Sequence, residues 1–196
     1  MDNLGNIYII YLKKAFCFDK NGELVWSQTY DDFFNANGTS ICFLEGNIYS
    51  YAQLDSHYQY TGIISINAAN GVLNWMLNTI EYTNYTLYNT YEMTLTSENI
   101  TTAAKYVGIG FFGYNGLILD VLNQTADKIP SSNIVVDSQG NLFYGTYFGE
   151  SFISLSSEQN INWELPIDYY FIQNIALYNG RAVFTTRHNP YLWVIR

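Results

Sequence analysis

The stretch "FDKNGELVW" (residues 18–26) decides how the whole chain is interpreted. A tryptophan follows the glycine of an Asn-Gly pair by four residues, and apolar residues lie on both sides of the pair. Asn-Gly between apolar residues predicts a tight hairpin turn, because both residues tolerate positive φ. Related phrases recur three more times along the chain: "NAANGVLNW", "FGYNGLILD" and "LSSEQNINW". The recurrence predicts a repeating β-unit rather than an isolated turn.

A second phrase recurs in step with the first. It is Gly-Asn followed by an apolar run, and its copies are "GNIYIIY", "GNIYSYA", "ENITTAA", "GNLFYGT" and the degenerate "GRAVFTT". The glycine position of the first phrase recurs after 49, 45 and 43 residues (22, 71, 116 and 159). Four strands per blade at about 40–50 residues per blade is the period of a β-propeller. An insertion in the second copy is expected at residues 54–60.

The sequence therefore predicts an all-β fold, a β-propeller of four-stranded antiparallel blades. About five blades are expected, over residues 1–30, 37–80, 90–125, 132–166 and 171–196, with eighteen strands in all. The two end blades are expected to be incomplete, with three strands each. Either the chain is a single small propeller domain, or it is a section of a larger propeller. The second reading is favoured because both ends interrupt the repeat.

Composition agrees with this fold and excludes several classes of function. Aromatic residues make up 18% of the chain, with 19 Tyr and 12 Phe, and aromatics favour pleated, half-buried surfaces. The net charge is −9 with only 8 Lys and Arg, which predicts no nucleic-acid binding, because phosphates require clustered cations. No apolar run approaches the roughly 20 residues of a membrane span, so no membrane insertion is expected. The first residues are not expected to form a signal peptide, because they start acidic and their apolar run is short.

The region "GNIYIIYLKKAFCFDKNGELVWS" (residues 5–27) resembles the pyrroloquinoline-quinone-type β-propeller repeat, a quinoprotein-like repeat. That repeat has an apolar strand, a second strand ending near an Asp, an Asn-Gly or Thr-Gly turn, and a Trp four residues after the Gly. The third copy departs from the pattern, with Asp120 in the tryptophan position. The fourth departs too, with Gln159 in the glycine position.

The resemblance implies that the tryptophan of one blade packs against the neighbouring blade and docks the two. This structural role is carried over to the tryptophans and turn glycines that match the repeat: Trp26, Trp75, Trp163, Gly22, Gly71 and Gly116. A tryptophan suits the role because it buries a large area and its N–H needs a partner.

The resemblance also raises the question of an enzyme. Enzymes with this repeat bind the quinone and Ca²⁺ in the central channel, and use a catalytic Asp and often adjacent cysteines. The two cysteines, Cys17 and Cys42, are not adjacent, and no position receives the family's catalytic roles. No catalytic, metal-binding or cofactor-binding residue is therefore predicted, and no cofactor. Other proteins with such repeats are non-catalytic scaffolds that bind proteins, for example in outer-membrane protein assembly, which favours an extracytoplasmic location.

Other chemistry-bearing residues have ordinary interpretations. "DKNGE" and "DSQGN" look slightly like calcium loops, but they lack the full ligand set and are interpreted as turns that Asp19 and Asp137 cap. His57 and His188 are interpreted as loop residues, and Asp31-Asp32 as a solvated pair.

The leading functional hypothesis is a non-enzymatic scaffold that presents blade loops to a protein or glycan partner. The tyrosine-rich segment "EYTNYTLYNTYE" (residues 81–92) is either such a binding face or a loop that packs on the propeller. Two alternatives stay open: part of a quinone-dependent dehydrogenase, or a propeller lectin.

Overall fold

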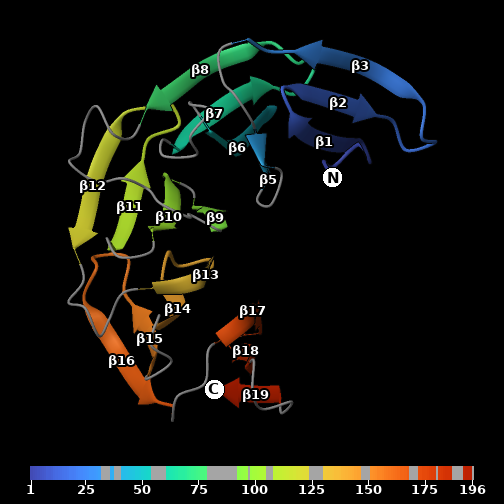
Figure 1. Cartoon of the computed structure of the whole chain (residues 1–196). Coiled ribbons are helices and arrows are strands. Elements are labelled where there is room, and N and C mark those ends of the chain that lie inside the picture. Colours follow the sequence, from blue (N-terminus) through green and yellow to red (C-terminus); the bar gives the residue numbers. More distant parts are fainter. Residues whose placement is uncertain are drawn as a thin grey trace. The chain divides into compact units, whose positions relative to one another are not determined.

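A computed structural model shows a chain built from antiparallel β-sheets (Figure 1). It describes residues 1–31, 36–37, 41–53, 61–78, 92–96, 98–104, 108–123, 130–146, 151–167, 172–179, 181–186 and 192–195. In these residues every regular element is a strand, which confirms the all-β prediction. The insertion at residues 54–60, both histidines and nearly all of the tyrosine-rich segment lie outside the described residues.

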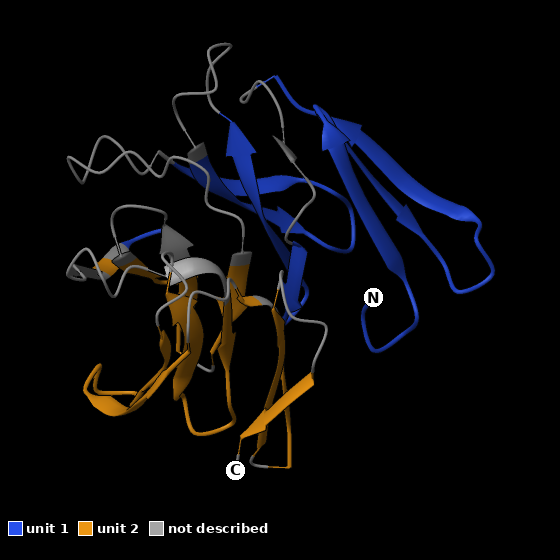
Figure 2. Cartoon of the chain, turned by 60° about the horizontal axis from the view of Figure 1, so that its bottom comes forward, with its two compact units in different colours: residues 1–88, 115–117 blue, residues 89–114, 118–196 orange. Residues whose placement is uncertain are grey.

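The chain divides into two compact units (Figure 2). The first comprises Met1–Tyr88 and Asn115–Leu117, and the second Asn89–Tyr114 and Ile118–Arg196. The first unit holds two four-stranded sheets, in the spatial orders β3-β2-β1-β4 and β5-β6-β7-β8. Its strands are β1 Ile7–Leu12, β2 Lys14–Phe18, β3 Leu24–Thr29, β4 Ala36–Asn37, β5 Ile41–Leu44, β6 Asn47–Gln53, β7 Thr61–Asn67 and β8 Leu73–Asn78.

The second unit holds three sheets, in the orders β12-β11-β10-β9, β13-β14-β15-β16 and β17-β18-β19. Its strands are β9 Glu92–Leu95, β10 Ile100–Ala104, β11 Gly108–Phe112, β12 Ile118–Asn123, β13 Pro130–Val136, β14 Leu142–Thr146, β15 Ser151–Leu155, β16 Ile161–Pro166, β17 Ile172–Tyr178, β18 Arg181–Thr186 and β19 Leu192–Ile195. The division into blade-sized repeats along the chain stays a prediction about domain organisation.

One strand was not expected. The first sheet was predicted to have three strands, but β4 pairs with β1 through Tyr11–Asn37 and Leu12–Ala36. The prediction was wrong because a strand of two residues leaves no periodic pattern in the sequence. β4 gives β1 a partner along its second edge, and an edge strand without a partner is a liability.

Burial of the middle strands differs between the sheets. β15 is buried throughout, and β6 is buried from Ile48 to Ala52, whereas most residues of β1 are exposed. The outer strands are largely exposed, and in β3 the only half-buried residue is Trp26. β3 therefore contributes to the core through its tryptophan, whereas β8 also buries Leu77 and β16 also packs Leu165 against the core.

The four-stranded sheets share one irregularity, in the pairs β2–β3, β7–β8, β11–β12 and β15–β16. In these pairs the register shifts after Cys17, Ser65, Phe111 and Ser154, respectively. A bulge places two residues of one strand opposite one of its partner and increases the local twist. The repeated bulge fixes which residues of the four sheets are structurally equivalent.

Candidate functional site

Four of the sheets have four strands, and in each of them a row of three residues crosses three neighbouring strands. These strands are β1–β3, β6–β8, β10–β12 and β14–β16. In the first sheet Tyr8 lies opposite Cys17, and Cys17 lies opposite Trp26. The rings of Tyr8 and Trp26 have centroids 6.2 Å apart, although a strand lies between them. Neighbouring strands are about 4.8 Å apart. The two rings can meet only because the middle residue is small.

The same arrangement occurs in two further sheets. The row Tyr49–Ser65–Trp75 has ring centroids 6.1 Å apart, and the row Phe143–Ser154–Trp163 has them 6.0 Å apart. Tilted aromatic pairs at this distance stabilise beyond the area that they bury. Large–small–large is therefore the size pattern of the row.

In the first unit the row's tryptophan lies on the turn of the adjoining sheet. The Trp26 Nε1 donates a hydrogen bond of 2.9 Å to the carbonyl oxygen of Ala68. A Cβ at Gly71 would lie 2.7 Å from two ring carbons of Trp26, so the indole covers the glycine directly. Trp75 covers Gly116 similarly, since a Cβ there would lie 3.1 Å from its ring. Gly22 differs, because no described atom comes within 4 Å of its Cβ position.

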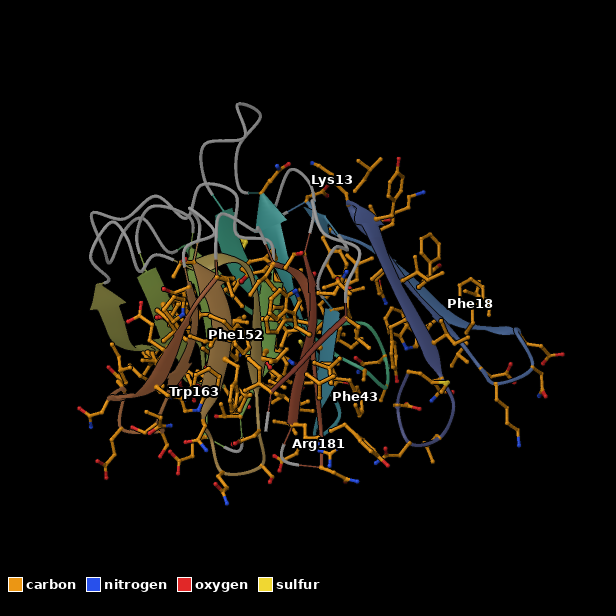
Figure 3. The ribbon with its side chains drawn as sticks, turned by 90° about the horizontal axis from the view of Figure 1, so that it is seen from below. Lys13, Phe18, Phe43, Phe152, Trp163 and Arg181 are labelled. Atoms are coloured by element: carbon orange, nitrogen blue, oxygen red, sulfur yellow. The ribbon has the colours of Figure 1, made fainter. Side chains whose placement is uncertain are left out.

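Trp163 lies against aromatic neighbours in the second unit. Its ring centroid is 5.6 Å from that of Phe152, on the neighbouring strand (Figure 3). A cavity of about 390 Å³ opens beside the indole. Its described lining includes Asp137, Tyr178 and Arg181, so the cavity combines aromatic rings with charged groups.

In the sheet β9–β12 the size pattern of the row is inverted. Thr101 lies opposite Phe111, and Phe111 opposite Asp120, so a large residue stands between two smaller ones. The repeat in the sequence identifies Asp120 as the residue in the tryptophan position. Thr101 and Phe111 were not predicted, although the absence of an aromatic residue from "ENITTAA" was a usable signal.

A cavity of about 760 Å³ lies where this row meets the sheet β13–β16, within the second unit. This volume is typical of a ligand pocket. Phe111, Thr101, Leu95 and Leu142 contribute to its lining. Three turns supply the rest of the described lining through Thr96, Glu98, Asn99, Asp137, Ser138, Gln139, Gly140, Ser156, Ser157, Glu158 and Gln159, and β12 adds Leu119.

The lining of this cavity is acidic. Glu98, Asp137 and Glu158 bring three carboxylates, and none of the described lining residues is Lys or Arg. The backbone amides of Gln139 and Asn141 donate to Asp137 Oδ1, at 2.8 and 2.9 Å, which holds that turn in shape. Its preformed turns and negative charge suit the cavity to an uncharged or cationic guest.

Asp19, the other acidic turn residue singled out in the sequence, caps its own turn. Its Oδ1 accepts hydrogen bonds from the amides of Asn21 and Glu23, at 2.9 and 2.8 Å. The hydrogen bond from Glu23, with the others, lowers the pKa of Asp19. Cys17 is buried in β2 and Cys42 half-buried in β5, and no disulfide joins them.

No helix among the described residues has the length and apolar character needed to span a bilayer. No three His, Cys, Asp or Glu side chains among them are grouped closely enough to bind a metal ion.

Comparison with known proteins relates the chain to others through its fold. No protein family matches the sequence, and no curated protein matches it either. Solved structures do match. A Bacteroides caccae protein of unknown function has a TM-score of 0.63 at 15% identity, over 92% of this chain and 66% of its own.

Two other solved structures agree. The computationally designed Ika8 protein has a TM-score of 0.69 at 8% identity, over 99% of this chain and 56% of its own. BamB from Moraxella catarrhalis has a TM-score of 0.59 at 12% identity, over 96% of this chain and 60% of its own. The chain thus spans between 56% and 66% of the length of these structures. BamB is a β-propeller protein, and the predicted propeller-type all-β fold is thereby confirmed.

Proposed function

We propose that this protein is a non-enzymatic β-propeller scaffold of quinoprotein-like repeats, and that it binds a protein partner. The observation that carries the proposal is the cavity of about 760 Å³ at the inverted row. In the other three rows, aromatic side chains occupy both end positions. At the inverted row the fold leaves a pocket in which four apolar residues, Leu95, Phe111, Leu119 and Leu142, meet the polar residues of preformed turns. Concave sites of this volume are the usual ligand-binding sites of proteins.

We also propose that the matching tryptophans and glycines dock neighbouring blades. The contacts of Trp26 with Ala68 and Gly71, and of Trp75 with Gly116, support this role. The proposed blade-docking set is Trp26, Trp75, Trp163, Gly71 and Gly116, and Gly22 belongs to it only through the turn that precedes Trp26, since no described atom lies within 4 Å of its Cβ position. Such docking would leave the turns rigid, and a rigid scaffold lowers the entropic cost of binding.

A glycan is the second candidate ligand, and the smaller cavity beside Trp163 favours it. An indole face next to Asp137, Tyr178 and Arg181 offers both a flat apolar surface and hydrogen-bonding groups. The quinone-dehydrogenase alternative stays open.

The test is affinity capture with the full chain as bait, compared with a variant in which the cavity is filled. Thr101→Tyr with Phe111→Ser and Asp120→Trp gives the inverted row the size pattern of the other rows. We expect one protein to be retained by the native chain and lost from the filled variant. Glu45→Gln, in an exposed turn of the first unit, is the matched control. Retention of no protein above background by the well-folded native chain would overturn the proposal.

A glycan array probes the second candidate. Binding of a glycan that Trp163→Ala abolishes, while Thr101→Tyr leaves it intact, would move the function to the smaller cavity.

A further inference from the structure

The inverted row identifies the shape that the larger cavity accepts. In the three other rows, the ends are Tyr or Phe on the second strand and Trp on the fourth, with ring centroids 6.0 to 6.2 Å apart. At the same positions the sheet β9–β12 has Thr101 and Asp120. The position that an internal aromatic ring occupies in the sister rows is thus left to a smaller side chain.

The floor of the cavity remains suited to an aromatic ring. Phe111 and Leu142 are buried, with 8% and 2% of their surfaces exposed, and both line the cavity. Phe111 stands where Cys17, Ser65 and Ser154 stand in the other rows. An entering ring would therefore pack against a phenyl ring, which favours offset or edge-to-face stacking.

The rim of the cavity favours positive charge over negative charge. Glu98 and Glu158 are exposed and lie on different turns, and Asp137 lies on a third. The whole chain carries a net charge of −9, so an anionic guest would be repelled both locally and at long range.

From this geometry we propose that the larger cavity binds an aromatic side chain, an indole above all, that carries or adjoins a positive charge. A protein partner would supply it from an exposed basic segment. The inference rests on the proposed function and names the chemistry of its partner. Trp, Tyr and Arg are the residues in which interface binding energy is concentrated, usually where they enter a desolvated pocket.

Tryptamine is the probe, because it joins an indole to an ammonium group and needs no knowledge of the partner. Binding to the full chain is measured by calorimetry, with indole-3-propionate as the anionic isostere and n-butylamine as the cation without a ring. We expect tryptamine to bind and both comparison compounds to bind at least about tenfold more weakly.

Two sets of variants locate the binding. Glu98→Gln with Glu158→Gln is expected to weaken tryptamine binding about three- to tenfold, as for the loss of two partly exposed ion pairs. The filled variant, or Thr101→Tyr alone if the triple variant does not fold, is expected to abolish it. Glu45→Gln should leave it unchanged.

Three results would overturn the inference. They are binding of indole-3-propionate as tight as that of tryptamine, binding of tryptamine by the folded filled variant, and no binding of tryptamine by the native chain. A partner that affinity capture retains and tryptamine fails to displace would overturn the inference alone. The proposed scaffold function would then stand.

Discussion

The Trp26 indole packs directly against Gly71, and its Nε1 donates a hydrogen bond of 2.9 Å to the carbonyl oxygen of Ala68. The donor and acceptor are 42 residues apart, so the contact joins two sheets of the first unit. The contact combines a large buried ring, a satisfied N–H group and a turn that only glycine fits. The stability of the chain should depend on each of these three features separately.

Gly71→Ala should destabilise the protein more than Gly22→Ala does. Both glycines have positive φ, +74° and +83°, so alanine is strained by about 1–2 kcal/mol at either position. Only at position 71 would the new methyl group also collide with Trp26, which adds about 1–3 kcal/mol. Urea unfolding of the two variants measures the difference. Equal losses of unfolding free energy would contradict the proposed docking role of Gly71.

Trp26→Phe should cost about 1–3 kcal/mol of unfolding free energy, because the carbonyl of Ala68, a buried residue, loses its indole donor while an aromatic ring is retained. Chemical denaturation checks this, and Tyr11→Phe, at an exposed position of β1, is the control for a change of aromatic side chain. A loss no larger than that of Tyr11→Phe would show that the hydrogen bond contributes nothing.

Ser154→Phe should disrupt the row Phe143–Ser154–Trp163. Ser154 is 1% exposed, and a phenyl ring there would occupy the space over which the two outer rings meet. Overpacking of this kind costs about 1–3 kcal/mol. Thermal unfolding and tryptophan fluorescence should both change, whereas Ser154→Ala should have a small effect on either. An unperturbed fluorescence spectrum for Ser154→Phe would refute the size rule for the row.

The stability of the first unit should fall in acid because of Asp2. Partial desolvation favours the protonated carboxyl, but hydrogen bonds from the Tyr8 hydroxyl and from the Asn6 and Leu4 amides prevail and lower the pKa of Asp2 to about 2. A carboxyl whose pKa is lower in the folded state stabilises the fold above its unfolded pKa of about 3.9. That contribution is lost as the pH falls from about 4 to about 2.

The Asp2 prediction is tested by comparing melting temperatures of the native chain and Asp2→Asn. The difference between them should be largest above pH 4 and should shrink towards pH 2. Glu45→Gln is the control for removing an exposed charge. A difference that does not change with pH would assign the effect of Asp2 to something other than its ionisation.

Much of the fold could be predicted because turn chemistry is local. An Asn-Gly pair at residues 21–22, 70–71 or 115–116 specifies a positive φ whatever surrounds it, and all three glycines adopt one, between +74° and +83°. The fourth turn shows the limit of this reasoning, because Gln159 adopts a φ of +66° without being glycine. Its position was predicted from the period of the repeat and from Trp163, four residues later.

The candidate site could not be predicted in the same way. Thr101, Phe111 and Asp120 are separated by ten and nine residues along the chain, and only the strand pairing with its bulge places them in one row. The turns that complete the cavity come from residues 96–99, 137–140 and 156–159. The repeat relates these turns along the chain, but it does not place all three around one space.

The sequence by itself determined the repeat, the turns and the all-β class, because each depends on residues within a few positions of one another. The tertiary structure alone decided that Trp26 lies over Gly71, that β4 pairs with β1, and that an acidic cavity opens at Thr101 and Phe111. Packing decides these features, since side-chain volumes across three strands and two sheets must fit together. In the inverted row Thr101–Phe111–Asp120, the small end residues leave unfilled the position that an aromatic ring occupies in the other rows.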